Sequence, residues 1–252
     1  MESGKLIQED ESKLRYLTRA LPETAEEFAV EIVNMVNRSG YAHVGWPISL
    51  EDYEAIARRI GTITLRSDVK LDLNRDLIQR QSRTIHRPSI YQPHPLGFHT
   101  DPNADIVSWY CLEQDAVDGA LLLLDASDVA QHFSAAELAT LGKVEIPSPA
   151  PDPEREKLPL VPLLSKVTER YHVHYVPWLL GDAYDAETKD ALEKFSDYVS
   201  LKEKTQLIKV LFKKYDSLFI DNHRMLHGRG AISENSLRHL VRFYFRMAQA
   251  AY

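Results

Sequence analysis

The amino-acid sequence predicts a mainly β protein with flanking helices and a double-stranded β-helix (jelly-roll) core. Amphipathic helical patterns open the chain, and the short β-branched and aromatic runs that follow are mostly not separated by long helices. This order favours packed sheets over alternating strand–helix units. At 252 residues the chain is long enough to bury a substantial core, so we expect one domain over residues 1–252.

Two amphipathic helices are predicted near the start of the chain. The first begins at a capping box formed by Thr24 and Glu27, and Gly40 marks its end. The second begins at Ser49 and ends at Gly61. Short strands are expected after each helix, over residues 41–46 and 63–65.

The rest of the chain reads mainly as strands. Strands are predicted at 106–112, 121–124, 167–178, 205–212, 217–220 and 240–245, and helices at 134–141 and 185–198. Only four residues separate 205–212 from 217–220, which predicts a hairpin. Residues 146–163 contain six prolines, which favours a loop over a strand. This loop could be a mobile lid or a passive surface excursion.

Composition narrows the class of protein. The formal net charge is −7, so there is no electrostatic reason to expect nucleic acid or an anionic membrane as a partner. The single cysteine, Cys111, excludes an internal disulfide and fits a reducing compartment. No apolar run approaches the ~20 residues of a membrane span, and the N-terminus lacks a signal-peptide pattern. We therefore expect a soluble cytoplasmic protein without a nucleic-acid or membrane partner, with its oligomeric state open.

Two distant stretches contain residues that could bind a metal. His99 and Asp101 lie two apart, so on a strand they would share a face and could offer a nitrogen and an oxygen to one point. His227 would complete a set of two histidines and one carboxylate, which leaves coordination sites open as in non-haem Fe(II) oxygenases. Arg238 and Arg242 follow eleven and fifteen residues later and could bind a carboxylate.

Other histidines compete for these roles. His99 and Asp101 could belong to an ordinary turn, because Thr-Asp-Pro-Asn is turn-like. His172 and His174 also lie two apart on a predicted strand, but no matching carboxylate and histidine follow them. We expect them to be wall or core residues, one of which could face the substrate.

The motifs together resemble the Fe(II)/2-oxoglutarate-dependent dioxygenases of the taurine dioxygenase and clavaminate synthase-like group. The resemblance rests on His99-Thr-Asp101, on the run from Asp221 to Arg229, and on the Arg-His-Leu that begins at Arg238. The opening of the chain, about residues 1–65, is also similar and would pack against the catalytic barrel.

The resemblance implies a function and assigns residues to it. Fe(II) would be bound by His99, Asp101 and His227, and His223 would be structural. Arg238 would hold the far carboxylate of the co-substrate 2-oxoglutarate, and O₂ would be the oxidant. The expected reaction is oxidation, by default hydroxylation, of an unactivated C–H bond.

The same resemblance suggests roles for further residues. Arg242 would contact an anionic group of the substrate, which suggests an amino acid or a derivative. His94 and His174 are candidates for the pocket wall, whereas Arg224 and Arg229 are expected to be structural. One position departs from the family: a leucine, Leu121, stands near the place where a threonine often binds 2-oxoglutarate.

Two other classes of function remain open at this stage. A catalytically silent or non-oxidative metal-binding jelly-roll protein, such as a cupin-like isomerase or hydrolase, could use the same ligands. A nucleic-acid dealkylase could also use them, but the acidic balance of the chain disfavours it.

Overall fold

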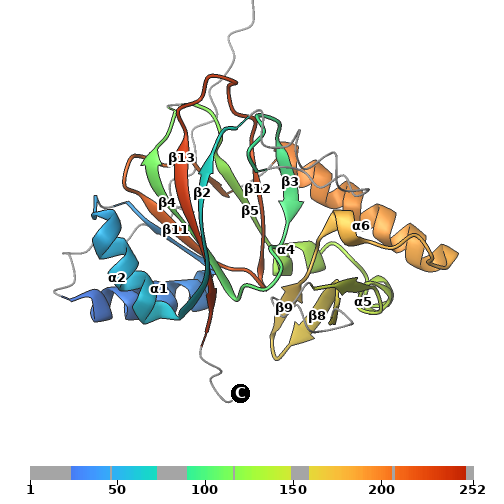
Figure 1. Ribbon diagram of the computed structural model, residues 1–252. Coiled ribbons are helices and arrows are strands. Elements are labelled where there is room, and N and C mark those ends of the chain that lie inside the picture. Colours follow the sequence, from blue (N-terminus) through green and yellow to red (C-terminus); the bar gives the residue numbers. More distant parts are fainter. Residues whose placement is uncertain are drawn as a thin grey trace, which may run out of the picture.

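In the computed structural model, two antiparallel sheets face each other (Figure 1). The structure describes residues 24–45, 47–72, 90–115, 117–148, 159–205 and 208–247. The five-stranded sheet has the order β1 (Tyr41–Val44), β11 (Ser217–Asp221), β4 (Ile106–Glu113), β13 (His239–Arg246) and β2 (Thr62–Lys70). The four-stranded sheet has the order β10 (Ile208–Val210), β5 (Leu121–Asp125), β12 (Met225–Arg229) and β3 (Leu96–His99). This is the predicted jelly-roll arrangement.

Strand alternation divides the side chains between two environments. On β4, Val107 and Trp109 enter the core between the sheets, whereas Tyr110 joins the core under the N-terminal helices. On β13, Leu240 lies between the sheets and Phe243 faces the helices. The inward row of each strand is therefore available to build a site between the sheets.

Helices α1 (Ala25–Ser39) and α2 (Leu50–Ile60) cover the outer face of the five-stranded sheet (Figure 1). Both begin and end at the predicted residues, and α1 has the predicted capping box. Tyr53 of α2 is fully buried, and its hydroxyl hydrogen-bonds Ser108 of β4. Over the residues that the structure describes, α1 and α2 thus pack on the outer face of this sheet.

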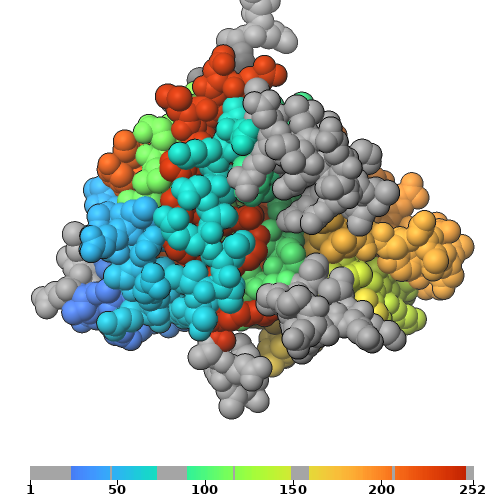
Figure 2. Space-filling view, viewed as in Figure 1, coloured from blue at the N-terminus to red at the C-terminus, as the bar shows by residue number. Residues whose placement is uncertain are grey.

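The outer face of the four-stranded sheet is covered by a second group of elements (Figure 1). The helices are α4 (Ala126–Ala130), α5 (Ala135–Leu141), η1 (Pro177–Leu179) and α6 (Ala186–Thr205). The strands are β6 (Glu145–Pro147), β7 (Leu160–Pro162), β8 (Leu164–Val167) and β9 (Arg170–Val173), paired as β6–β7 and β8–β9. In Figure 2 the N-terminal helices and α6 lie on opposite sides of the molecule.

Two predictions about the strands were wrong. Residues 205–212 and 217–220 do not form a hairpin, because β10 pairs with β5 and β11 pairs with β4 and β1, in different sheets. The ends of the proline-rich segment 146–163 form β6 and β7, so it is not a loop throughout. Its middle lies outside the described residues, and its role as a lid stays a prediction.

The strand predicted over 167–178 is also shorter than expected. It becomes β9 followed by the 3-10 turn η1, which begins at Pro177.

In the described part of the chain, none of the helices has the length and apolar character needed to cross a bilayer.

Candidate metal and anion site

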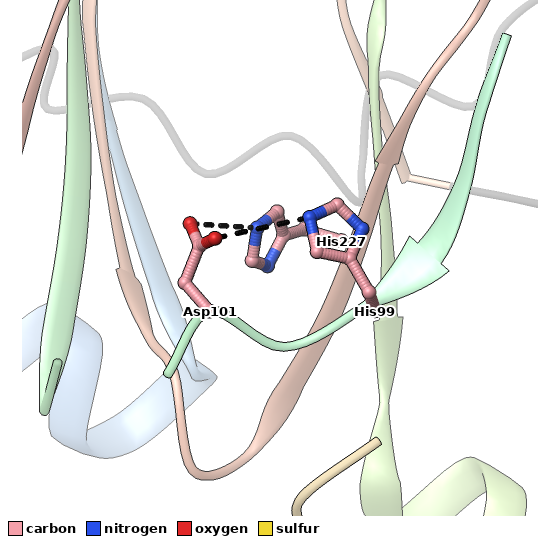
Figure 3. A group of neighbouring side chains, drawn as sticks. All are labelled: His99, Asp101 and His227. Atoms are coloured by element: carbon pink, nitrogen blue, oxygen red, sulfur yellow. Dashed lines mark ion pairs between the residues drawn. The ribbon is translucent and has the colours of Figure 1, made fainter. Parts of the chain in front are cut away.

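His99 and His227 lie directly opposite each other on neighbouring strands. They are register partners on β3 and β12, and residues paired in this way share a face of the sheet. Their ring centroids are 4.4 Å apart. Figure 3 shows both rings pointing toward Asp101. Strand pairing therefore brings together two histidines that are far apart in the sequence.

Asp101 joins the histidines from a turn and not from a strand. Strand β3 ends at His99, so strand alternation does not explain how Asp101 reaches the site. Asp101 Oδ1 lies 3.9 Å from His99 Nε2, and Asp101 Oδ2 lies 3.3 Å from His227 Nε2. Ligand atoms of all three residues lie within 4.8 Å of one another, and all three side chains are buried.

Asn222 fixes the position of Asp101. Its Oδ1 accepts from the Asp101 backbone N–H at 2.9 Å, and its Nδ2 donates to the Asp101 carbonyl at 2.6 Å. The same Nδ2 donates to the carbonyl of Ala104 at 2.8 Å. Asn222 begins the Asn-x-Arg motif, and no role was predicted for it from the sequence.

The chemistry of the three groups fits a divalent metal. Octahedral metals bind imidazole and carboxylate at about 2.1 Å, which places neighbouring ligand atoms about 3 Å apart. His99 Nδ1 lies 2.9 Å from the Gly97 carbonyl, a contact that places the proton on Nδ1 and leaves Nε2 free to coordinate. Among the described residues, the buried Asp101 Oδ2 makes no hydrogen bond of standard geometry, although His227 Nε2 and Arg242 Nη1 lie near it, which suits an oxygen that a cation would bind.

Electrostatics keep these ligands in their metal-binding forms. Burial, together with the nearby His227, lowers the pKa of His99 to about 3, so the imidazole is neutral. Burial alone would raise the pKa of Asp101, but Arg242 and His227 outweigh it and hold that pKa below its usual value. A neutral imidazole and an ionised carboxylate are the forms that coordinate metals.

Three arginines face the same cavity as the histidines. The cavity lies between the sheets and is otherwise mostly apolar. Its lining includes Arg229, Arg238 and Arg242 with Val69, Ile90, Leu96, Trp109, Leu121, His99, His227 and Gly228. Arg238 and Arg242 thus share a face, as predicted, and Arg229, which was expected to be structural, also reaches the cavity.

The three arginines differ in their partners. Arg242 Nη1 lies 3.5 Å from Asp101 Oδ2, and this carboxylate outweighs burial and raises the pKa of Arg242. Arg238 donates through Nε to Gln114 at 3.1 Å, and burial lowers its pKa to about 9. Arg229 donates to two backbone carbonyls, and burial lowers its pKa to about 10. Of the three, Arg242 alone has a carboxylate within 4 Å among the described residues.

Other predicted site residues lie elsewhere. The His94 side chain is exposed, and its carbonyl accepts from Arg229. His174 is hydrogen-bonded to the backbone of Pro147 and does not line the cavity. His172 stacks on His223 at 5.7 Å, and His223 contacts Asp105 at 3.1 Å. The structure therefore brings His227, and not His223, to Asp101.

A family model covers most of the chain. The model described as "Taurine catabolism dioxygenase TauD, TfdA family" matches residues 21–244. The chain belongs to this family. It is an iron- and 2-oxoglutarate-dependent dioxygenase, as the resemblance of its motifs implied.

Solved structures share the fold of this TauD-family chain. The non-heme iron oxygenase OrfP in complex with Fe and alpha-ketoglutaric acid is 17% identical, with a TM-score of 0.65 over 90% of this chain and 81% of that one. Asparagine oxygenase in complex with Fe(II), 2S,3S-3-hydroxyasparagine and succinate is 13% identical, with a TM-score of 0.65 over 89% and 79%. No curated protein sequence matches the chain.

Proposed function

We propose that this TauD-family dioxygenase hydroxylates an unactivated C–H bond of a small carboxylate-bearing substrate, namely an amino acid or a derivative. The observation that carries the proposal is the buried group of His99, Asp101 and His227 beside a cavity lined by three arginines. Two solved structures of the same fold support the substrate class, because they contain hydroxylated arginine and hydroxylated asparagine.

Fe(II) would be held by His99, Asp101 and His227. When bound, the iron, 2-oxoglutarate and O₂ together supply the oxidation, in which 2-oxoglutarate is converted to succinate and CO₂. The protein orients the reactants and excludes water. The apolar lining from Ile90, Trp109 and Leu121 suits this second role.

Arg238 would hold the far carboxylate of 2-oxoglutarate. It is a buried cation with no carboxylate partner among the described residues, and a guanidinium can bind a carboxylate through two parallel hydrogen bonds. Gly119 supports this placement. Its backbone has a φ of +73°, and an added Cβ would lie 3.1 Å from Arg238 Cδ, so the glycine leaves room for the arginine.

Arg242 would contact the anionic group of the substrate. Its ion pair with Asp101 favours the alternative in which a protein acid is its partner. Both roles are compatible, because an ionised Asp101 that binds iron shares its charge with the metal. His94 and His174 lie outside the cavity lining, so we place no substrate contact on them.

A succinate-release screen tests the proposed function. Iron-loaded protein would be incubated with 2-oxoglutarate and a panel of amino acids, sulfonates and small carboxylates. We expect an amino acid to stimulate succinate release and to gain 16 Da, the mass of one oxygen, by mass analysis. Stimulation by sulfonates alone would contradict the amino-acid assignment. The single free cysteine, Cys111, fits action in the reducing cytoplasm, and the net charge of −7 gives no electrostatic reason to expect a nucleic-acid partner.

A further inference from the structure

Two arginines in the cavity have no acid to neutralise them. Arg242 has Asp101, but in the part of the chain that the structure describes no carboxylate lies within ion-pair distance of Arg229 or Arg238. Both arginines line the same cavity, where burial and then the charge of Arg229 lower the pKa of Arg238. Burying two like charges in an apolar cavity is costly unless an anion lies between them.

Arg229 is held rigidly by one of its terminal nitrogens. Its Nη2 donates to the carbonyl of Gln92 at 2.8 Å and also to that of His94. Its Nε and Nη1 are buried and have no hydrogen-bond partner among the described residues. A guanidinium fixed at one nitrogen, with other N–H groups unused, is already oriented to donate to a ligand.

The neighbours of Arg229 offer no competing acceptor on the sheet. It pairs with Leu121 on β5 and with Leu96 on β3, and both leucines line the cavity. Since paired residues share a face, these apolar side chains flank the guanidinium. Among the residues that the structure describes, the unused N–H groups therefore have no acceptor, and the cavity contents are their available partners.

From this geometry we infer that Arg229 is a second ligand of the far carboxylate of 2-oxoglutarate, which it grips together with Arg238. The inference rests on the proposed function, in which Arg238 binds that carboxylate. One carboxylate has enough lone pairs to accept from both guanidinium groups. The inference also explains how a leucine can stand at position 121, near the place where family members often have a threonine. Arg229, on the neighbouring strand β12, would supply the hydrogen-bond donor that a threonine hydroxyl would otherwise provide.

Equilibrium binding of two keto acids to Arg229→Gln tests the inference without turnover. Iron-loaded protein would be titrated anaerobically with 2-oxoglutarate and with 2-oxopentanoate, which keeps the keto acid but lacks the far carboxylate. The visible charge-transfer band of the bound keto acid reports the dissociation constant. We expect 2-oxoglutarate to bind about 10- to 100-fold more weakly, as for loss of a charge-assisted hydrogen bond, and 2-oxopentanoate to be unaffected.

Two further variants sharpen the test. Arg224→Gln is the matched control, because Arg224 belongs to the same motif but pairs with Asp125 at 2.5 Å outside the cavity lining. It should leave both dissociation constants unchanged. Arg229→Lys keeps the charge and should lose part of the preference for 2-oxoglutarate, and it carries the test if Arg229→Gln does not fold.

Each other outcome is decisive. Equal weakening of both keto acids would mean that Arg229 only supports the backbone near Gln92 and His94, and would overturn the inference. Unchanged binding of both keto acids would also overturn the inference and would reassign the unused N–H groups of Arg229 to the substrate. If the parent protein bound neither keto acid, the proposed function itself would fail, which is a different result from a parent that binds both.

Discussion

Asn222 holds Asp101 by both of its backbone polar groups, accepting from the N–H at 2.9 Å and donating to the carbonyl at 2.6 Å. Asn222 lies directly after β11, whereas Asp101 lies just beyond β3, so this contact ties the two sheets together next to the histidines. The position of a candidate metal ligand thus depends on an amide that is not itself one of the candidate ligands.

Replacing Asn222 should therefore weaken metal binding. Asn222→Ala leaves the backbone groups of Asp101 without partners, and loss of such supporting contacts typically costs 10- to 100-fold in metal affinity. It should also lower the free energy of unfolding by roughly 2 kcal/mol or more, because buried polar groups lose their hydrogen bonds. Metal titration and chemical denaturation measure the two effects. Asn235→Ala, at an exposed asparagine, should change neither.

Asp101→Ala should abolish catalytic iron binding while the fold survives. The carboxylate is the single acid in the candidate ligand set, and its removal leaves two histidines. Iron binding and keto-acid turnover, with circular dichroism as the check on folding, measure the result. His172→Ala, in the competing histidine pair, should retain iron. Parental turnover in Asp101→Ala would show that the ligand assignment is wrong.

Arg238→Lys should raise the KM for 2-oxoglutarate. Lysine keeps the charge but cannot form two parallel hydrogen bonds with a carboxylate. Weakening such a pair in a dry pocket should cost ~2 kcal/mol or more, which is roughly thirty-fold in binding. A KM that changes for the primary substrate alone would reassign Arg238 to the substrate.

Arg242→Ala should uncouple the reaction. If Arg242 positions the substrate, the variant should still convert 2-oxoglutarate slowly, while stimulation by substrate is lost. Succinate release measured with and without substrate separates the two rates. Stimulation at the parental level would contradict an anionic substrate at Arg242 and would leave its ion pair with Asp101 as its role.

Asp105 should contribute to stability at neutral pH and lose that contribution in acid. Burial alone would raise its pKa, but His223, the N–H of Met247 and Arg246 outweigh it and lower the pKa. A carboxylate with a lowered folded-state pKa stabilises the fold above its unfolded pKa, near 4, and ceases to do so as the pH falls through the folded value.

Comparison with Asp105→Asn measures this contribution. The variant should be about 1 kcal/mol less stable than the parent at pH 7, and the difference should shrink below pH 4. Denaturation curves across this range provide the measurement. A difference that is constant with pH would assign the effect to packing.

The sequence predicted those parts of the structure that depend on local signals. The helix beginning at Thr24 has a capping box and Gly40 as its stop, and both are read within one segment. The glycines that follow His227 disfavoured a helical pairing of His223 with His227, and β12 is indeed a strand; the choice of His227 over His223 came from the resemblance to the family motif. His99, Asp101 and His227 were proposed together from the combined motifs and the family resemblance, and the structure places them side by side, although Asp101 reaches the site from a turn and not by strand alternation.

The parts that failed depend on contacts between distant segments. No sequence signal within residues 205–220 indicates that β10 pairs with β5 in one sheet while β11 pairs with β4 in the other. Prolines 147 and 162 were expected to exclude strands, but β6 and β7 form a separate two-stranded sheet, where a missing N–H at an edge is tolerated. The inward orientation of Arg229 likewise depends on its place on β12, between β5 and β3.

The pairing of His99 with His227 has a consequence for how the protein folds. Strand β3 is one of the two edge strands of its sheet, and a slip of one residue would turn His99 to the opposite face. A metal bound by both histidines would stabilise β3 only in the correct register. Backbone amides of β3 should therefore exchange hydrogen faster once the metal is removed.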